Sequence, residues 1–146
     1  LTLLLLICGL LVSGVSYVKN ISEDSPSNEF FIALEKIPDN SIVFSSIDNG
    51  YWIDYTNKKT AFDAFSFESD VKLNDYNDIL MLRDAEISRF LLDKYNITHI
   101  LIDTKVRKNI WGNQMDGLLW VLNYDIEHFN NVYDGDEVDV WRYTKI

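Results

Sequence analysis

The sequence predicts an α/β domain with a small parallel or mixed sheet flanked by helices and a C-terminal β-hairpin, preceded by one transmembrane helix. Three observations predict this fold. Residues 1–18 form an uncharged apolar stretch. Two apolar runs at 41–46 and 97–103 have the β-branched and aromatic composition of buried strands, with a helical pattern between them. An Asp-Gly dipeptide at 134–135 separates two strand-like segments, as in a hairpin turn.

The apolar stretch is directed to a membrane. It has no charge before Lys19, and its length is near the lower limit for crossing ~30 Å of hydrocarbon as a helix. It is either a signal peptide or the last transmembrane helix of a longer protein, and the lack of a preceding Met and basic residues favours the helix. We therefore expect a transmembrane helix over 1–19, a linker over 20–28 and an extracytoplasmic α/β domain over 29–146.

Composition excludes two classes of protein. A net charge of −10 repels nucleic acid and anionic headgroups. Hydrophobic residues at 47% and aromatic residues at 14% are too many for a disordered chain. Cys8 is the only cysteine and lies in the apolar stretch, so no disulfide is expected in the domain.

The predicted elements follow the order of a parallel α/β layer. Ser27 and Asp84 are suitable helix N-caps. The succession of strand, helix and strand predicts that 41–46 and 97–103 lie parallel, and the hairpin is expected to close one sheet edge. In chain order the elements are a helix over 28–37, a strand over 41–46, one or two helical turns over 50–57, a strand over 59–65, a surface loop over 66–83 with a short helix in 76–82, a helix over 84–95, a strand over 97–103, a helix over 114–124, and a hairpin of 129–133 with 137–143.

Two of these helices have apolar residues at helical spacing, which predicts that these residues share one apolar face of each helix. The residues are Ile87, Phe90, Leu91 and Tyr95 in the first helix, and Met115, Leu118, Leu119 and Leu122 in the second.

The first candidate site directly follows the first predicted strand. It consists of Asp48, Asn49, Gly50, Tyr51 and Trp52. In α/β proteins ligands gather at the carboxyl ends of parallel strands, so this position favours a substrate-binding site. The alternative is structural: Asp or Asn caps a short helix, the glycine relaxes the turn, and the two aromatic residues pack on the sheet.

The same stretch resembles the start of the C-terminal globular module of archaeal and bacterial oligosaccharyltransferases. In that family a buried strand runs into Trp-Trp-Asp-Tyr-Gly, commonly followed by Tyr-Trp-Ile. Here the frame contains SIDNG at 46–50, followed by YWI at 51–53. The degenerate motif keeps Asp48 and Gly50 and has Ser46 and Ile47 in place of the tryptophans.

The resemblance implies a function as well as a fold. The two family tryptophans and the aspartate hold the hydroxyl residue of the acceptor peptide, and Ser46 and Ile47 provide neither an aromatic wall nor an indole N–H. The related multi-spanning glycosyltransferases use lipid-phosphate-linked sugar donors. Their catalytic carboxylates and any divalent metal belong to loops between earlier membrane helices.

On this resemblance the chain is the C-terminal domain of a polytopic membrane glycosyltransferase. We expect it to support acceptor or donor binding without catalysing alone, and to bind no cofactor itself. Its expected partners are its own transmembrane helices, a lipid-linked sugar, and an acceptor peptide or glycan, with no nucleic acid. Its expected location is the extracytoplasmic side of the cell membrane.

Other charged residues offer weaker sites. Asp134, Asp136, Glu137 and Asp139 could surround Ca²⁺, but they lack the spacing of an EF-hand loop, and a solvated hairpin explains them. His99 and His128 match no ligand spacing and are expected to be structural. The remaining candidates are the strand-end or helix-end carboxylates Asp54, Asp63 and Asp103, and two basic groups, Lys58 with Lys59 and Lys105 with Arg107 and Lys108, which could meet donor phosphates or simply be solvated.

Two alternative functions remain open. One is a membrane-anchored or secreted extracellular binding domain without enzymatic activity. The other is a free-standing hydrolase, which would need a carboxylate pair or a histidine pair converging near Asp48.

Overall fold

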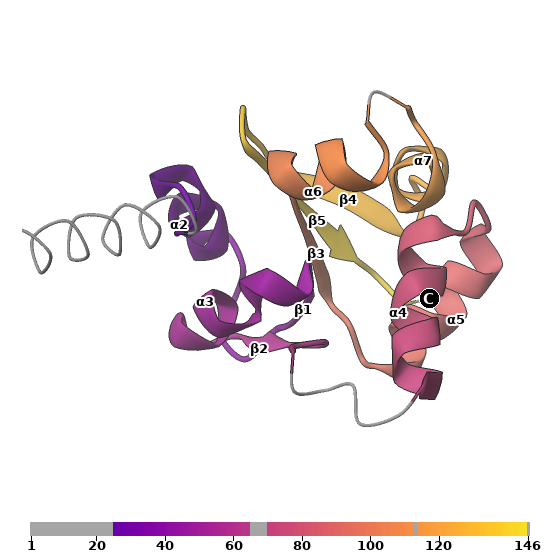
Figure 1. Ribbon diagram of the computed structural model, residues 1–146, viewed down its shortest axis with the longest axis horizontal. Coiled ribbons are helices and arrows are strands. Elements are labelled where there is room, and N and C mark those ends of the chain that lie inside the picture. The colour runs from indigo at the N-terminus through magenta and orange to yellow at the C-terminus, as the bar shows by residue number, and fades with distance from the viewer. Residues whose placement is uncertain (1–24, 65–69, 113, 146) are drawn as a thin grey trace, which may run out of the picture.

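A five-stranded mixed sheet forms the centre of the domain (Figure 1). The structure is a computed structural model that describes residues 25–64, 70–112 and 114–145. The strand order across the sheet is β2-β1-β3-β5-β4. The strands are β1 (Ile42–Phe44), β2 (Lys59–Thr60), β3 (His99–Asp103), β4 (Phe129–Asp134) and β5 (Val138–Tyr143).

The predicted α/β pairing of the sheet is confirmed. Strand β1 lies parallel to β3, with Val43 opposite His99, and β2 pairs in parallel on the other side of β1. Strand β5 runs antiparallel to β3 and forms the predicted hairpin with β4, which closes one edge of the sheet. The parallel half therefore presents the carboxyl ends of β1 and β3 side by side.

Helices cover both faces of the sheet (Figure 1). Because side chains alternate along a strand, Ile100 and Ile102 of β3 face one layer and Leu101 faces the other. The helical elements are α2 (Asn28–Glu35), the 3₁₀ helix η1 (Ile47–Asn49), α3 (Gly50–Tyr55), α4 (Asp70–Met81), α5 (Ala85–Lys94), α6 (Thr104–Ile110) and α7 (Gly117–Tyr124).

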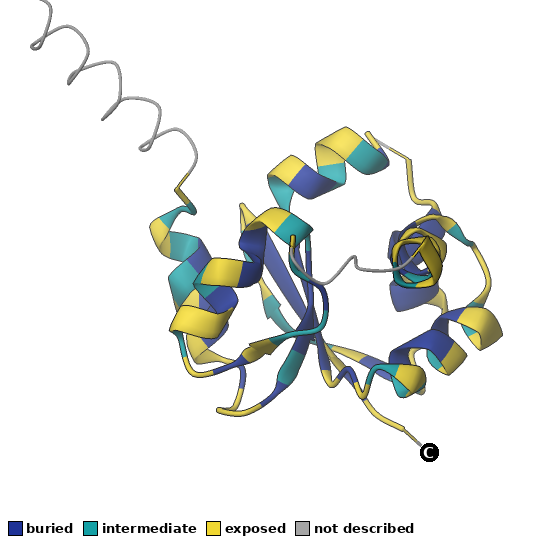
Figure 2. Cartoon of the chain, turned by 60° about the horizontal axis from the view of Figure 1, so that its bottom comes forward, coloured by how far each residue is buried: buried dark blue, intermediate teal, exposed yellow. Residues whose placement is uncertain are grey.

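The two faces have separate hydrophobic cores. Helices α2 and α3 pack on one face through residues such as Leu34 and Ile53. Helices α4, α5 and α7 pack on the other, through residues such as Ile79, Leu92 and Leu122. Figure 2 shows the buried side of each helix turned toward the sheet.

Two predicted N-caps are confirmed and hold helix starts in place. The Ser27 hydroxyl accepts a hydrogen bond from the Phe30 N–H, and the Asp84 carboxylate accepts from the N–H groups of Glu86 and Ile87. Such caps stabilise a helix by about 1 kcal/mol each, because they pair backbone donors that the helix leaves free.

The short helix predicted in 76–82 falls within α4, but the surface loop predicted around it was wrong over 70–75, because α4 is a twelve-residue helix. Its buried residues Tyr76, Ile79 and Leu80 form a narrow apolar stripe, while the Asp and Asn residues around them weaken the periodic pattern. Packing against α5 and α7 stabilises a helix that local propensity does not favour.

Helix α6 was missed because its seven residues follow β3 without a break and contain three basic residues. The predicted strand over 59–65 is shorter than expected, since β2 has only two residues. Two predicted apolar faces were wrong in part. In the first helix Ile87 is 42% and Phe90 67% exposed, and in the second Met115 precedes α7 and is 58% exposed.

The predicted transmembrane helix over 1–19 and most of the linker over 20–28 lie outside the described residues. Among the helices that the structure describes, none combines the length and apolar character that crossing a bilayer requires.

Gly117 at the start of α7 allows a close contact that is specific to glycine. Its φ is +50°, and a Cβ atom there would lie 2.3 Å from the Leu80 carbonyl oxygen and 2.7 Å from Trp111 Nε1. The indole N–H of Trp111 donates to that same oxygen at 3.2 Å. We expect Gly117→Ala to lower the free energy of unfolding by about 3 kcal/mol or more, measured by urea denaturation.

Gly112→Ala is the matched control. Gly112 also has a positive φ of +59°, but among the described residues no atom beyond its chain neighbours lies within 4 Å of the position that a Cβ atom would take there. Its cost should be only the left-handed strain of about 1 kcal/mol. Equal losses in the two variants would contradict the role of the Gly117 contact.

Candidate functional site

A pocket opens at the carboxyl ends of β1 and β3, where the candidate segment follows β1. Its volume is about 310 Å³. Helix α2 with the residues before it, η1, helix α6 and the hairpin turn surround it. The lining residues are Ser25, Pro26, Ser27, Phe30, Ser46, Asp48, Asn49, Asp103, Thr104, Lys105, Val106, Asn109, Ile110, Glu137 and Val138.

The back of the pocket is a buried hydrogen-bond network centred on Asn49. The Asn49 amide donates to Asp103 Oδ2 at 2.8 Å and to Ser45 Oγ at 3.0 Å. The other oxygen of Asp103 accepts from the Val106 N–H at 2.7 Å and so caps α6. Asn49 is 8% exposed. Its side chain therefore joins the ends of the two parallel strands.

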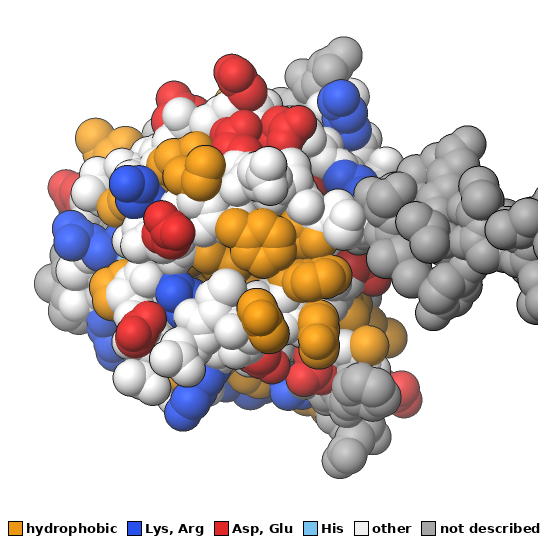
Figure 3. Space-filling model, turned by 90° about the vertical axis from the view of Figure 1, so that its left-hand side faces the viewer, with side chains coloured by type: hydrophobic (Ala, Val, Ile, Leu, Met, Phe, Trp, Pro, Cys, Tyr) orange, Lys and Arg blue, Asp and Glu red, His pale blue; other side chains and the backbone are white. Residues whose placement is uncertain are grey.

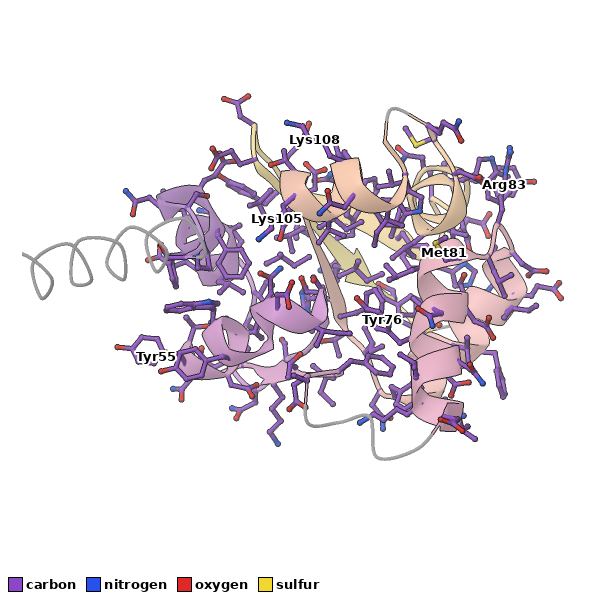
Figure 4. All side chains as sticks on the ribbon, in the orientation of Figure 1. Tyr55, Tyr76, Met81, Arg83, Lys105 and Lys108 are labelled. Carbon is purple, nitrogen blue, oxygen red and sulfur yellow. The ribbon has the colours of Figure 1, made fainter. Side chains whose placement is uncertain are left out.

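Tyr76 supports the same segment from α4. Its hydroxyl hydrogen-bonds the Ile47 backbone and the Ser46 side chain, and burial raises the pKa of this phenol. Figure 4 shows Tyr76 pointing from α4 toward the centre of the molecule. The 3₁₀ turn that presents Asp48 is thus held from both β3 and α4.

Side chains of positive and negative charge line the mouth of the pocket, where they could contact a ligand. Asp48 is exposed and lines the pocket together with Lys105, Asn109 and Glu137. Figure 4 shows Lys105 on the side of α6 that faces α2 and α3. A carboxylate, an ammonium and an amide can together accept from and donate to a hydroxyl-rich or amide ligand.

Gly50 is needed where α3 begins against the chain after β2. A Cβ atom on Gly50 would lie 3.0 Å from the Cβ of Asp63 and 3.4 Å from the Thr60 methyl group. The glycine therefore has a packing role. It does not line the pocket, unlike its neighbours Asp48 and Asn49.

Tyr51 and Trp52 lie on a different surface from the pocket lining. Trp52 packs edge-on against Phe31 with ring centroids 6.0 Å apart, and Tyr51 packs against Trp52 at 5.2 Å. Tyr51 is 69% exposed. Figure 3 shows hydrophobic side chains gathered on this side of the molecule. The structure thus brings two of the five predicted site residues together in the pocket.

The two histidines make hydrogen bonds within the fold and have a structural role. The His99 ring lies on β3, is 6% exposed and contacts the Thr98 hydroxyl at 3.0 Å. Burial, with a smaller contribution from Arg142, lowers its pKa. His128 Nδ1 lies 2.7 Å from the Asp125 carboxylate. Neither histidine lines the pocket.

The acidic residues of the hairpin, Asp134, Asp136, Glu137 and Asp139, do not form a common binding site. Asp139 is buried and forms an ion pair with Arg107 of α6, which corrects the expectation of a solvated side chain. The turn is instead held by α2, since both Glu29 carboxylate oxygens accept from the Glu137 N–H at 3.2 Å. Within the described residues no three His, Cys, Asp or Glu side chains are grouped as metal ligands.

The remaining charged candidates have separate roles. Asp54 accepts from the Thr60 N–H at 2.8 Å and joins α3 to β2. Lys58 is buried and donates to the Thr56 carbonyl at 2.9 Å and to Asp39 at 3.4 Å, so it is not a solvated loop charge. Asp103 and Lys105 are the ones that reach the pocket.

Comparison with solved structures identifies the fold. The chain resembles the crystal structure of the C-terminal globular domain of oligosaccharyltransferase from Archaeoglobus fulgidus, with a TM-score of 0.63 and 15% sequence identity. The alignment covers 82% of this chain and 99% of that domain. This chain has the fold of that oligosaccharyltransferase domain. No protein-family model and no curated protein sequence matches it.

The resemblance predicted from SIDNG and YWI is therefore confirmed at the level of the fold. The oligosaccharyltransferase-like fold accounts for nearly the whole length of the solved domain. Sequence reasoning missed the roles of Ser45, Tyr76 and Asn109. A usable signal existed only for Asp103 and Lys105, because they directly follow the second buried strand, as Asp48 follows the first.

We expect Asn49→Asp to destabilise the domain by about 2 kcal/mol at pH 7. The new carboxylate would replace an amide donor beside Asp103, so two like charges would lie within hydrogen-bond distance. The pKa of one of them would rise in the folded state. The deficit should therefore shrink as the pH falls toward 4, measured by urea unfolding across this range.

Asn49→Ala is the control for this experiment. It removes the same amide without adding a charge, so its deficit should depend little on pH. If both variants show the same pH dependence, repulsion between the new carboxylate and Asp103 is not the cause of the pH-dependent loss of stability.

His99 provides a pH prediction of opposite sign. Its pKa is lowered in the folded state, so the unfolded chain takes up a proton first as the pH falls below about 6.5. The stability that His99 contributes is present above that pH and is lost on acidification. We expect His99→Gln to lose less unfolding free energy between pH 7 and pH 5 than the wild type, and parallel losses would contradict this.

Proposed function

We propose that this chain is the extracytoplasmic C-terminal domain, with its preceding transmembrane helix, of a polytopic membrane glycosyltransferase of the oligosaccharyltransferase kind. The domain supports binding of the acceptor peptide or glycan, or of the lipid-linked sugar donor, and does not catalyse transfer alone. The catalytic carboxylates and any divalent metal belong to the membrane part of the protein. The likeness to the Archaeoglobus fulgidus oligosaccharyltransferase domain supports this proposal.

The observation that carries the proposal is the position of Asp48. It stands on a braced turn at the carboxyl end of β1 and lines the pocket. Asn49 and Tyr76 use their polar groups to hold that turn, whereas Asp48 is exposed. A fixed, solvent-facing carboxylate is suited to accept a hydrogen bond from a hydroxyl or amide of the acceptor.

Lys105 extends the site toward the other substrate. It is in the first turn of α6 and lines the same pocket as Asp48. An ammonium group binds phosphate as a point charge, so Lys105 is suited to the phosphate of a lipid-linked donor. The site then brings an acceptor-binding carboxylate and a donor-binding cation to one pocket.

Ser46 and Ile47 define how this site differs from the family motif. Ile47 packs against the larger core and Ser46 lines the pocket beside Asp48. Neither provides an aromatic wall. The acceptor is therefore held by polar contacts at Asp48, and not between tryptophan rings.

The test is an acceptor titration of the full-length protein in membranes. We expect Asp48→Ala to raise the acceptor KM about tenfold or more with little change in kcat. Loss of one hydrogen bond to a charged group costs about 1.5–3 kcal/mol, and tenfold corresponds to about 1.4 kcal/mol. An interaction that holds substrate and transition state equally changes KM alone.

Asp78→Ala is the matched control, because Asp78 is an exposed carboxylate of α4 outside the pocket. It should leave both kinetic constants unchanged. Unchanged transfer in Asp48→Ala with an intact fold would reject the site. A wild-type protein that transfers no sugar from any lipid-linked donor would reject the glycosyltransferase and favour a membrane-anchored or secreted binding domain.

A further inference from the structure

Four aromatic side chains form a surface group that the pocket does not use. This aromatic patch consists of Phe31 of α2 and Tyr51, Trp52 and Tyr55 of α3. Phe31 and Trp52 pack edge-on at 6.0 Å, and Trp52 and Tyr51 at 5.2 Å. Tyr51 is 69% exposed and Tyr55 is 76% exposed. Figure 3 shows hydrophobic side chains in the middle of this face.

The geometry of α3 produces the patch. Ile53 is fully buried against the sheet, so the opposite side of this six-residue helix points outward. Tyr51 and Tyr55 are four residues apart and share that side. Figure 4 shows Tyr55 directed away from the body of the domain, on the side where α2 lies. Two neighbouring tyrosines are thus kept in solvent.

The chain upstream brings this face close to the apolar segment. Residues 1–18 are apolar, and residues 19–27 connect them to α2. A connection of this length reaches at most about 30 Å when fully extended. Because Phe31 is in the first helix after that connection, the patch lies within reach of any membrane that holds residues 1–18.

The side chains of the patch match the chemistry of a bilayer surface. Tyrosine and tryptophan are enriched where membranes meet water, since their rings enter the apolar region and their polar groups stay hydrated. The chain has a net charge of −10, which disfavours anionic lipids. These properties together select zwitterionic headgroups.

We infer that the aromatic patch rests in the headgroup region of a zwitterionic bilayer, beside the point where the apolar segment enters it. This inference rests on the membrane attachment contained in the proposed function. The patch and the pocket share helix α2, since Phe30 of the pocket lining packs against Phe31 of the patch at 5.6 Å.

A second copy of the chain fits the patch less well. Aromatic side chains bury about 150–250 Å² each, and Phe31 and Trp52 are already partly covered. The patch offers a few hundred Å², on the order of half or less of the roughly 800 Å² that each partner contributes to a stable protein interface. A bilayer requires no such minimum area, because the apolar segment already supplies the attachment.

The test uses a nitroxide label on the 146-residue chain bound to phosphatidylcholine vesicles. Cys8→Ser removes the native thiol, and Tyr55→Cys provides the labelling site. We expect the nitroxide at this position to collide severalfold more often with oxygen, which dissolves in the bilayer, than with a water-soluble nickel chelate. Tyr51→Ser in the same background should reduce that preference while leaving the melting temperature unchanged, because Tyr51 is exposed.

Phe90→Cys provides the matched control label. Phe90 is 67% exposed on α5, which packs on the opposite face of the sheet from α3. It should be more accessible to the nickel chelate. Equal, water-like accessibility at both positions on vesicle-bound chains would overturn the inference alone. Failure of the chain to float with vesicles would overturn both the inference and the membrane attachment. Sugar transfer by the full-length protein tests the proposed function separately.

Discussion

The contact between Asn49 and Asp103 is the constraint on which the site depends. Asp103 ends β3 and Asn49 ends η1, the turn that follows β1, and the 2.8 Å hydrogen bond between them joins two segments that are 54 residues apart in sequence. Asp103 at the same time caps α6. One carboxylate therefore determines the position of η1, the start of α6 and the pocket between them.

The two faces of the sheet serve different purposes. The face covered by α4, α5 and α7 contains the larger core and supplies Tyr76, which braces the turn of Asp48. The face covered by α2 and α3 contains the smaller core and presents the aromatic patch. The pocket lies at the end of the sheet between these layers. A rigid sheet can thus hold a polar site and an apolar surface in a constant relation.

The strands were the most predictable part of the fold. Continuous β-branched runs indicated β1 and β3, and Asp134-Gly135 indicated the hairpin, because these patterns reflect local backbone preference and burial on both faces. The first half of helix α4 escaped prediction because the stability of this helix comes from packing of Tyr76, Ile79 and Leu80. The exposure of Phe90 was equally unpredictable, since helical spacing does not specify the width of the buried face.

The sequence by itself determined that a polar segment beginning at Asp48 follows a buried strand, and that this segment resembles an oligosaccharyltransferase motif. Only the tertiary structure decided that Asp48 and Asn49 line a pocket with Lys105, while Tyr51 and Trp52 face away from it. The physical reason is helical rotation combined with long-range packing. Successive residues of η1 and α3 point in different directions, and the sheet that lies behind them is assembled from distant parts of the chain.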